Sequence, residues 1–254
     1  MMNAFITGAA SGIGKATADA LLKRGWSLAL ADIAVADLNV VKEEYPDRVS
    51  VYALDVTDES AFSSAVADFA AQHNGKLRLM FNCAGVLEVN RFTDISTRRH
   101  DQIIDINVKG VVHGCRSAYP FLRDTPGAQV INMSSASATY GIPEFAVYSA
   151  SKFAVQGLTE ALNIEWRKDG IHVGDIMPPF VKTPMLTSQE HGAAIIDALG
   201  VNLTAEDVAE AVMKQLSFKL THRPVSLPFT LLFLFSQITP RPLTGLLIRL
   251  LSRH

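Results

Sequence analysis

The alternation of short β-rich runs with longer helical runs is the feature that most constrains the fold of this chain. Parallel strands need a long crossover between them, which is usually a helix, so this order predicts βαβ units. The 254 residues are 48% hydrophobic and 19% charged, which suits one compact domain with a large core. The pattern therefore predicts an α/β fold with a parallel sheet and helices on both faces. The expected strands lie near 2–7, 27–32, 49–54, 78–82, 128–134 and 171–177, and the expected helices near 13–24, 36–45, 58–73, 97–123 and 148–169.

The first strand runs directly into a glycine-rich turn that contains Gly8, Gly12 and Gly14, and a helix follows. Such a turn lets the backbone approach a pyrophosphate, and the start of the helix offers free N–H groups and a favourable dipole. The spacing here is G-x-x-x-G-x-G, whereas the common dinucleotide pattern is G-x-G-x-x-G. The place of the turn, between a strand and a helix, makes it a candidate dinucleotide site.

Tyr148 and Lys152 stand four residues apart, so on a helix their side chains share one face. A free tyrosine has a pKa of about 10, and a nearby cation favours the phenolate. We therefore expect Lys152 to pull the pKa of Tyr148 toward neutral pH and to make it a usable acid or base. Ser134 and Ser135 end the strand near 128–134, where parallel sheets gather ligands, and Ser135 lies thirteen positions before Tyr148.

Together with the turn Asn82-Cys83-Ala84-Gly85 and with Asn107, these motifs resemble the short-chain dehydrogenase/reductase family, in its form of about 250 residues. The resemblance runs from Asn3 to about Met185 and implies a Rossmann-type doubly wound parallel sheet. The family has a second Asn where this chain has Cys83. The implied catalytic set is Asn107, Ser135, Tyr148 and Lys152.

The resemblance gives each member of this set a role in moving a hydride and a proton between an alcohol and a nicotinamide. Ser135 would hold the substrate oxygen, Tyr148 would exchange a proton with it, and Lys152 would also bind the nicotinamide ribose. Asn107 would anchor a water in the proton path, although from the residues alone it is an ordinary packing residue of the helix 97–123. No metal is expected, because no His or Cys cluster has ligand spacing.

The expected cofactor is NAD rather than NADP. Asp32 ends the second strand eighteen positions after Gly14, where an acidic residue holds the adenosine ribose and repels a 2′-phosphate. Asp55 matches the family's adenine contact, or else it caps the helix 58–73. Pro179 replaces the family's glycine and removes an N–H donor. The cofactor contacts implied are Thr7, Gly8, Ser11, Gly12, Ile13, Gly14, Asp32, Asp55, Val56, Asn82, Ala84, Gly85, Tyr148, Lys152, Pro178, Val181 and Thr183.

The segment 184–203 is expected to form a lid over the substrate, as the family implies. Apolar residues beside the motifs favour an apolar substrate such as a steroid, a retinoid or a long-chain alcohol. Polar lid residues leave a small polar carbonyl compound open, namely Gln189, Glu190, His191 and Asp197. A non-catalytic dinucleotide-binding sensor or scaffold is the alternative class, but all four catalytic positions are filled. The candidate substrate contacts are Leu87, Phe145, Phe180, Met185 and Leu186.

The chain is expected to divide into a catalytic domain, 1–227, and an apolar, helical C-terminal extension, 228–254. The run 225–240 carries no charge, and prolines break it short of the roughly 20 residues that a spanning helix needs. The last segment places Leu243, Leu246, Leu247 and Leu250 on one helical face, and Arg249 and Arg253 on another. A subunit-interface helix, a substrate cover and a membrane-surface helix all remain open.

The remaining composition indicates few other partners. A net charge of −2 without a basic cluster gives no reason to expect nucleic acid, and two cysteines are too few for a disulfide framework. Since the first strand begins almost at Met2, we expect no signal peptide and a cytoplasmic protein, with attachment to a membrane surface through 228–254 left open. The resemblance also implies a homodimer or homotetramer packed through 97–123 and 148–169.

Overall fold

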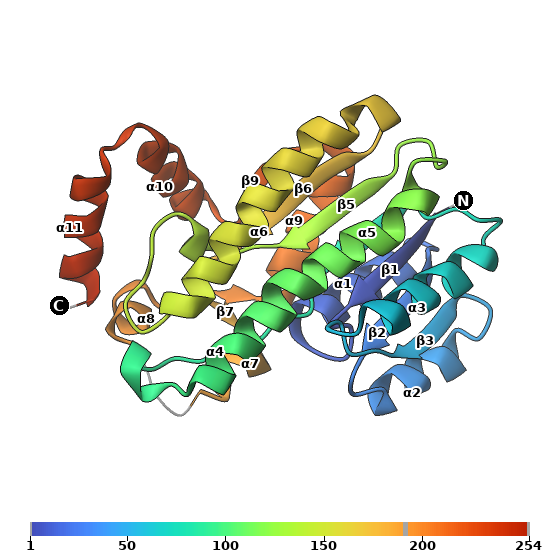
Figure 1. Cartoon of the computed structure of the whole chain (residues 1–254), viewed down its shortest axis with the longest axis horizontal. Coiled ribbons are helices and arrows are strands. Elements are labelled where there is room, and N and C mark those ends of the chain that lie inside the picture. The colour runs from blue at the N-terminus through green and yellow to red at the C-terminus, as the bar shows by residue number, and fades with distance from the viewer. Residues whose placement is uncertain (1, 190–192, 253–254) are drawn as a thin grey trace.

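A computed structural model describes residues 2–189 and 193–252, and its described part contains a parallel sheet of seven strands between two layers of helices (Figure 1). The strand order is β3-β2-β1-β4-β5-β6-β9, and every neighbouring pair is parallel. The strands of this sheet are β1 (Asn3–Thr7), β2 (Ser27–Asp32), β3 (Val49–Ala53), β4 (Leu79–Asn82), β5 (Gln129–Met133), β6 (His172–Met177) and β9 (His222–Pro224). The doubly wound Rossmann-type sheet that the sequence predicted is confirmed.

The helices cover the sheet through two separate apolar clusters. On one face, α1 and α9 pack together against strand side chains such as Ile6 and Ile131. On the other face, α3, α5 and α6 bury Phe62, Val111 and Val155 against Phe5. These helices are α1 (Gly12–Leu22), α2 (Ala36–Glu44), α3 (Glu59–Ala71), α4 (Thr97–Ile104), α5 (Gly110–Leu122), α6 (Ala146–Glu165) and α9 (Ala205–Ser217).

The first six strands and the five helices expected from the sequence lie where they were predicted, within a few residues. One detail differs, because the helix expected over 97–123 is divided by a π-turn, Asp105–Lys109, between α4 and α5. The short elements β7, α7, α8 and β8, within residues 181–204, were not predicted from the sequence, nor were helix α9 and the edge strand β9. Helix α9 begins with a capping box in which Thr204 and Asp207 bond each other's backbone, a pattern that the sequence shows and that was overlooked.

The C-terminal half of the structure adds smaller elements at the end of the sheet where the strands finish. A two-stranded sheet, β7 with β8, follows β6, and the lid segment contains α7 and α8. Helices α10 and α11 form an arm at one end of the molecule, on the left in Figure 1. The bounds are β7 (Val181–Lys182), α7 (Pro184–Thr187), α8 (Ala194–Leu199), β8 (Leu203–Thr204), α10 (Leu227–Ile238) and α11 (Arg241–Ser252).

Candidate active site

A cavity of about 470 Å³ lies at the carboxyl ends of the strands and brings most of the predicted site residues together. Its walls come from the loops after the first six strands of the chain, β1 to β6, from α6, and from the lid. Three predicted residues do not line the cavity, namely Thr7, Asn82 and Asn107. The predicted residues that line it are Gly8, Ser11, Gly12, Ile13, Gly14, Asp32, Asp55, Val56, Ala84, Gly85, Leu87, Ser135, Phe145, Tyr148, Lys152, Pro178, Phe180, Val181, Thr183, Met185 and Leu186.

The glycine-rich turn forms one end of the cavity and depends on the absence of side chains. Gly8 and Gly12 adopt φ of +68° and +53°, which residues with a Cβ rarely adopt. A Cβ on Gly8 would lie 2.9 Å from the Cα of Ala84, and a Cβ on Gly14 would meet the backbone carbonyl of Gly8. Helix α1 begins directly after Ser11, so its free N–H groups border the cavity. This arrangement suits the pyrophosphate of a dinucleotide.

Thr7 and Asn82 hold the cavity in shape from behind. The Thr7 hydroxyl accepts hydrogen bonds from the N–H groups of Cys83 and Ala84, at 3.0 and 3.1 Å, and so ties the loop after β4 to β1. The Asn82 amide is buried and donates to the side-chain oxygen of Asn132 at 2.9 Å. Both residues therefore position cofactor-site loops, and neither one borders the cavity.

Two aspartates border the cavity where strands β2 and β3 end. The Asp32 carboxylate accepts from the N–H of Ala10, inside that turn, at 3.0 Å and from the N–H of Ala34 at 3.1 Å. Asp55 accepts from the N–H and the hydroxyl of Thr57, at 2.9 and 2.8 Å, and also borders the cavity. Asp58, not Asp55, caps helix α3. Asp32 therefore lies in the cavity wall directly beside the glycine turn.

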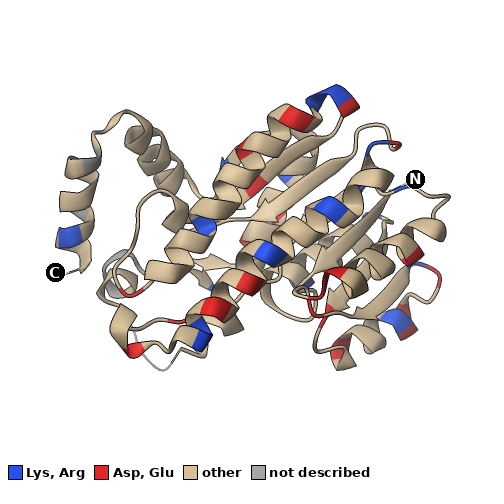
Figure 2. Cartoon of the chain, in the orientation of Figure 1, with Lys and Arg blue, Asp and Glu red and all other residues tan. Residues whose placement is uncertain are grey.

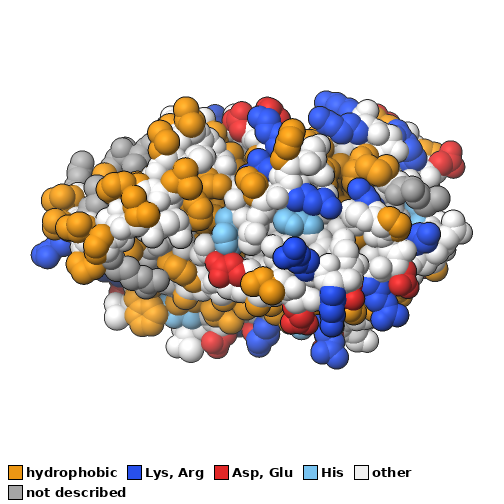
Figure 3. Space-filling view, turned by 90° about the horizontal axis from the view of Figure 1, so that it is seen from above, with side chains coloured by type: hydrophobic (Ala, Val, Ile, Leu, Met, Phe, Trp, Pro, Cys, Tyr) orange, Lys and Arg blue, Asp and Glu red, His pale blue; other side chains and the backbone are white. Residues whose placement is uncertain are grey.

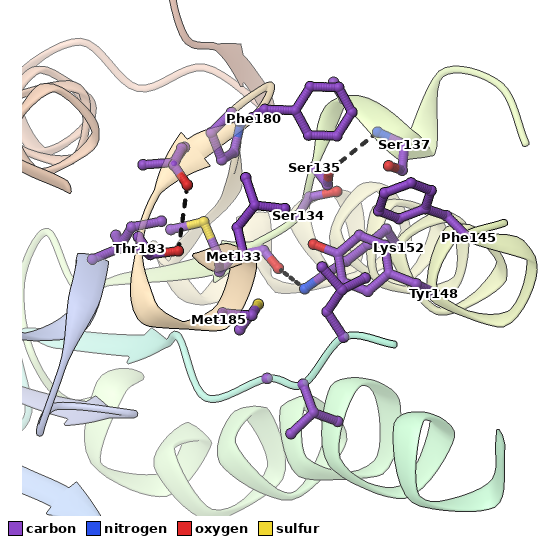
Figure 4. A pocket seen from close by; sticks show the side chains of 18 of the residues that line it. Met133, Ser134, Ser135, Ser137, Phe145, Tyr148, Lys152, Phe180, Thr183 and Met185 are labelled. Carbon is purple, nitrogen blue, oxygen red and sulfur yellow. Dashed lines mark hydrogen bonds between the residues drawn. The ribbon is translucent and has the colours of Figure 1, made fainter. Parts of the chain in front are cut away.

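Ser135, Tyr148 and Lys152 converge on the middle of the cavity (Figure 4). Lys152 is buried and donates to the carbonyl oxygen of Met133 at 2.9 Å, while its Nζ lies 5.4 Å from the centre of the Tyr148 ring. The Ser135 hydroxyl accepts from the N–H of Ser137 at 3.1 Å and lies close enough to the Tyr148 phenol to lower its pKa. The neighbouring Ser134 hydroxyl is buried and has no partner among the described residues. The structure thus places Ser135, rather than Ser134, against the tyrosine.

The expected lowering of the tyrosine pKa is wrong for this arrangement. Burial raises the pKa of Tyr148 to about 12, and the hydrogen bond from Ser135 opposes this only in part. Burial also lowers the pKa of Lys152 to about 8, and the neighbouring Cys83 and Asp175 oppose this only in part. Desolvation of the phenol, which no spacing of Tyr and Lys reveals, is therefore the largest influence on the pKa of Tyr148. At neutral pH Tyr148 is a protonated phenol and can donate its proton.

Asn107 lies within the π-turn and supports the site from the side. Its amide donates to the carbonyl of Val86 at 2.9 Å and to the hydroxyl of Ser151 at 3.1 Å, and its oxygen accepts from the N–H of Val86 at 2.8 Å. A Cβ on Gly85 would lie 3.3 Å from the Asn107 oxygen and 3.8 Å from Lys152 Nζ. The side chain thus fixes the loop after β4 beside Lys152.

The other end of the cavity is apolar. Phe145 and Phe180 pack with ring centres 6.0 Å apart, and Leu87 and Leu186 belong to the same cluster. The lid residue Gln189 points its amide at the backbone near Leu87 and Val89 and does not border the cavity. Of the other polar lid residues, Glu190 and His191 lie outside the described residues, and the side chain of Asp197 is not described.

Six wall residues of the apolar end were not predicted individually. They come from α10 and α11, which the sequence assigned only to an extension of open function. The signals that could have located them are the uncharged run 225–240 for α10 and the apolar helical face of the last segment for α11. These residues are Phe229, Leu232, Ser236, Thr244, Ile248 and Leu251.

Comparison with known proteins gives the same family as the motifs. The family model described as short chain dehydrogenase matches residues 2–194. A cyclohexanol dehydrogenase from Acinetobacter sp. (strain SE19) is 32% identical over 218 residues, which cover 84% of this chain and 87% of that protein. A 3-alpha-(or 20-beta)-hydroxysteroid dehydrogenase from Mycobacterium tuberculosis (strain ATCC 25618 / H37Rv) is 32% identical over 182 residues, 72% of this chain and 70% of that protein.

A solved structure agrees over nearly the whole chain. The short chain dehydrogenase/reductase from Burkholderia phymatum, in complex with NAD, superposes with a TM-score of 0.81 at 26% identity and covers 91% of both chains. The bare glycine turn, the start of α1 and Asp32 suit a nicotinamide dinucleotide, which the cavity can hold between Asp32 and Tyr148. Fold, motifs and relatives agree, and the chain belongs to the short-chain dehydrogenases, oxidoreductases that act on CH–OH groups.

Proposed function

We propose that this chain is an NAD(H)-dependent oxidoreductase that interconverts a secondary alcohol and a ketone, or an alcohol and an aldehyde, on an apolar substrate. The observation that carries this proposal is the position of Ser135 and Tyr148 between the two ends of one cavity. On one side lie the glycine turn and Asp32, and on the other lies a wall of aromatic and aliphatic side chains. A substrate oxygen at Ser135 and Tyr148 would have its carbon chain among those apolar residues.

The proposed roles follow from the hydrogen bonds of the site. A bound reduced nicotinamide would supply the hydride that carbonyl reduction needs. Tyr148, a buried phenol with a raised pKa, donates its proton to the carbonyl oxygen, and the Ser135 hydroxyl hydrogen-bonds that oxygen. In alcohol oxidation Tyr148 accepts the hydroxyl proton, which requires the Lys152 ammonium to favour the phenolate. Lys152 is therefore proposed to carry its charge during turnover and to bind the nicotinamide ribose.

NAD is the proposed cofactor, because the negative charge of Asp32 stands beside the glycine turn. Within the described part of the chain, the Asp32 carboxylate accepts from two backbone N–H groups and from no cationic side chain. It can accept from a ribose hydroxyl, whereas a 2′-phosphate at the same place would be repelled.

The proposed substrate class follows from the lining of the second end. Phe145, Phe180, Ile195 and Leu251 surround it, and the two relatives act on cyclohexanol and on hydroxysteroids, as their names say. Both are compact apolar alcohols. Hydrophobic walls discriminate between substrates by shape, and they bind a small polar carbonyl compound weakly. A steroid, a retinoid or a long-chain alcohol is the proposed class.

The test is nicotinamide reduction by the purified protein against steroid, retinoid, long-chain and small polar alcohols, with NAD and with NADP. Tyr148→Phe should still bind NAD, and its turnover should fall by about 100-fold to 10,000-fold. This is the usual contribution of a positioned general acid or base to the reaction rate. Tyr140→Phe is the matched control, since Tyr140 borders the same cavity and has no assigned role, and it should stay within a few-fold of the parent. Full activity of Tyr148→Phe refutes the mechanism. Tight NAD binding without turnover of any alcohol supports the sensor or scaffold alternative.

A homo-oligomer is also proposed, packed through the outer faces of α5 and α6. Val112 on α5 and Ile164 on α6 are exposed apolar side chains, and Ile164 is 77% exposed in the single chain. Analytical ultracentrifugation of the parent and of Ile164→Glu tests this proposal. A monomeric parent would refute it.

A further inference from the structure

Helices α10 and α11 are apolar on two opposite sides. Their inner side chains, among them Phe229, Ile248 and Leu251, line the cavity or pack against it. Their outer side chains face solvent, and each is at least 54% exposed. Figure 3 shows hydrophobic side chains crowded over this end of the molecule, on the left. We call the outer set the outer face of the arm, and its members are Leu227, Leu231, Leu234, Phe235, Ile238, Leu243, Leu246 and Leu250.

The arm is seated on the domain, so its outer face is a defined surface. Helix α11 packs on α8 of the lid, and a Cβ on Gly245 would lie 2.5 Å from the Tyr140 hydroxyl oxygen. On α10, the ring of Phe233 packs edge-on against the ring of His222 in β9, with centres 6.3 Å apart. These contacts fix which side of each helix is turned outward.

The charge of this part of the chain is one-sided. The last 44 residues contain no Asp or Glu, although the whole chain has a net charge of −2. No acidic residue marks α10 or α11 in Figure 2. The Lys and Arg residues of this segment are Lys214, Lys219, Arg223, Arg241, Arg249 and Arg253. An apolar face within a purely cationic segment is complementary to an anionic lipid surface.

We propose that the arm α10–α11 docks on an anionic lipid surface and that the active-site cavity receives its apolar substrate from that surface. The arm lies on the surface, because no helix in the described residues is long and apolar enough to cross a membrane. A second copy of the chain docked arm to arm would bring the same cationic segment and no opposite charge. Leu232 borders the cavity and is also 40% exposed, so the cavity wall reaches the outside of the arm. Docking is independent of the reaction, whereas substrate delivery rests on the proposed function.

The first experiment is sedimentation of the full-length protein with phosphatidylcholine vesicles and with vesicles that also contain phosphatidylglycerol. We expect binding to the anionic vesicles, weaker binding at high salt and little binding to phosphatidylcholine alone. Ile238→Glu, at an 80% exposed position of the outer face, should weaken binding by about tenfold or more, because it removes apolar contact and adds repulsion. The matched control is Val40→Glu, because Val40 is an exposed apolar residue of α2 and lies far from the arm in the sequence. This variant should bind vesicles as the parent does.

Two results would overturn docking. One is the absence of binding to either vesicle, and the other is equal binding to both. If the parent did not bind vesicles and Ile238→Glu changed the oligomeric size, the outer face would instead be a contact with a second copy of the chain.

Substrate delivery is tested by turnover of a vesicle-borne long-chain alcohol and of water-soluble cyclohexanol. Ile238→Glu should lose rate only on the vesicle-borne alcohol, and an equal loss on both refutes delivery from the surface. A parent that binds vesicles but oxidises neither alcohol refutes the proposed function and leaves docking intact.

Discussion

Gly14→Ala tests whether the glycine turn holds the dinucleotide. An ideal Cβ on Gly14 would lie 2.8 Å from the carbonyl carbon of Gly8 and closer still to its oxygen. Ordinary carbon contacts begin near 3.5 Å, and both crowded atoms belong to the backbone, so the start of α1 must move away from the turn. Extra atoms forced into a close-packed place cost about 1–3 kcal/mol. The same movement separates the N–H groups of α1 from the turn that is proposed to hold the pyrophosphate.

Two measurements on the same variant separate folding from binding. Urea unfolding should show a loss of about 1–3 kcal/mol at an unchanged denaturant slope. Calorimetric titration with NAD should show affinity lower by about tenfold or more, which corresponds to 1.4 kcal/mol at the phosphates. Both effects have one cause, and they are expected together.

The control is Gly157→Ala, on the exposed surface of α6. A Cβ on Gly157 meets nothing within 4 Å, and its φ is not in the left-handed region. Alanine should therefore stabilise the helix by about 0.5–1 kcal/mol and leave NAD affinity unchanged. If Gly14→Ala bound NAD as tightly as the parent, with the same stability, the assignment of the turn to the cofactor would be wrong.

Three further substitutions test the cofactor end of the site, its apolar end and the stability of the fold. Asp32→Ala should reduce the preference for NAD over NADP by roughly tenfold in kcat/KM, because it removes a charge that repels a 2′-phosphate. Leu251→Ala should raise KM for apolar alcohols by about tenfold with little change in kcat, since it removes wall contact from α11. His222 bonds Asp175 at 3.0 Å and Glu160 at 3.1 Å, which together raise its pKa above 6.5 against the effect of burial. The stabilisation from protonated His222 is therefore full below pH 6.5 and is lost as the pH rises through the raised pKa, so His222→Gln should cost more unfolding free energy at pH 6 than at pH 8.5. An equal cost at both values would contradict this assignment.

The motifs predicted the cofactor end of the site because its chemistry depends on local sequence. Gly8, Gly12 and Gly14 are needed at fixed offsets within one turn, and Tyr148 and Lys152 need one helical face. The structural role of Thr7 could not be predicted from local sequence in this way. Its hydroxyl holds the N–H of Ala84, 77 positions away, and no spacing shows that partner.

Long-range pairing also explains what was missed in the fold. Strand β9 has three residues and exists because it pairs with β6, in the register of His222 with Asp175. Such a short run carries little periodicity of its own. The pKa of Tyr148 was predicted wrongly for a related reason. Burial by residues from many parts of the chain raises this pKa, and the spacing of Tyr148 and Lys152 does not reveal that burial.

The substrate end of the cavity differs from the cofactor end in how its residues are specified. The proposed dinucleotide would constrain the glycine turn through close backbone approach, and the proposed reaction would constrain Ser135 and Tyr148 through hydrogen bonds to the substrate oxygen. A hydrophobic wall needs only volume and shape, which different residues from different segments can supply. Here Ile248 and Leu251 supply them from a helix beyond the 2–194 match to the family model. Because the same helix carries the outer face, a substitution at Leu250 and one at Leu251 should separate surface docking from substrate selectivity at adjacent positions.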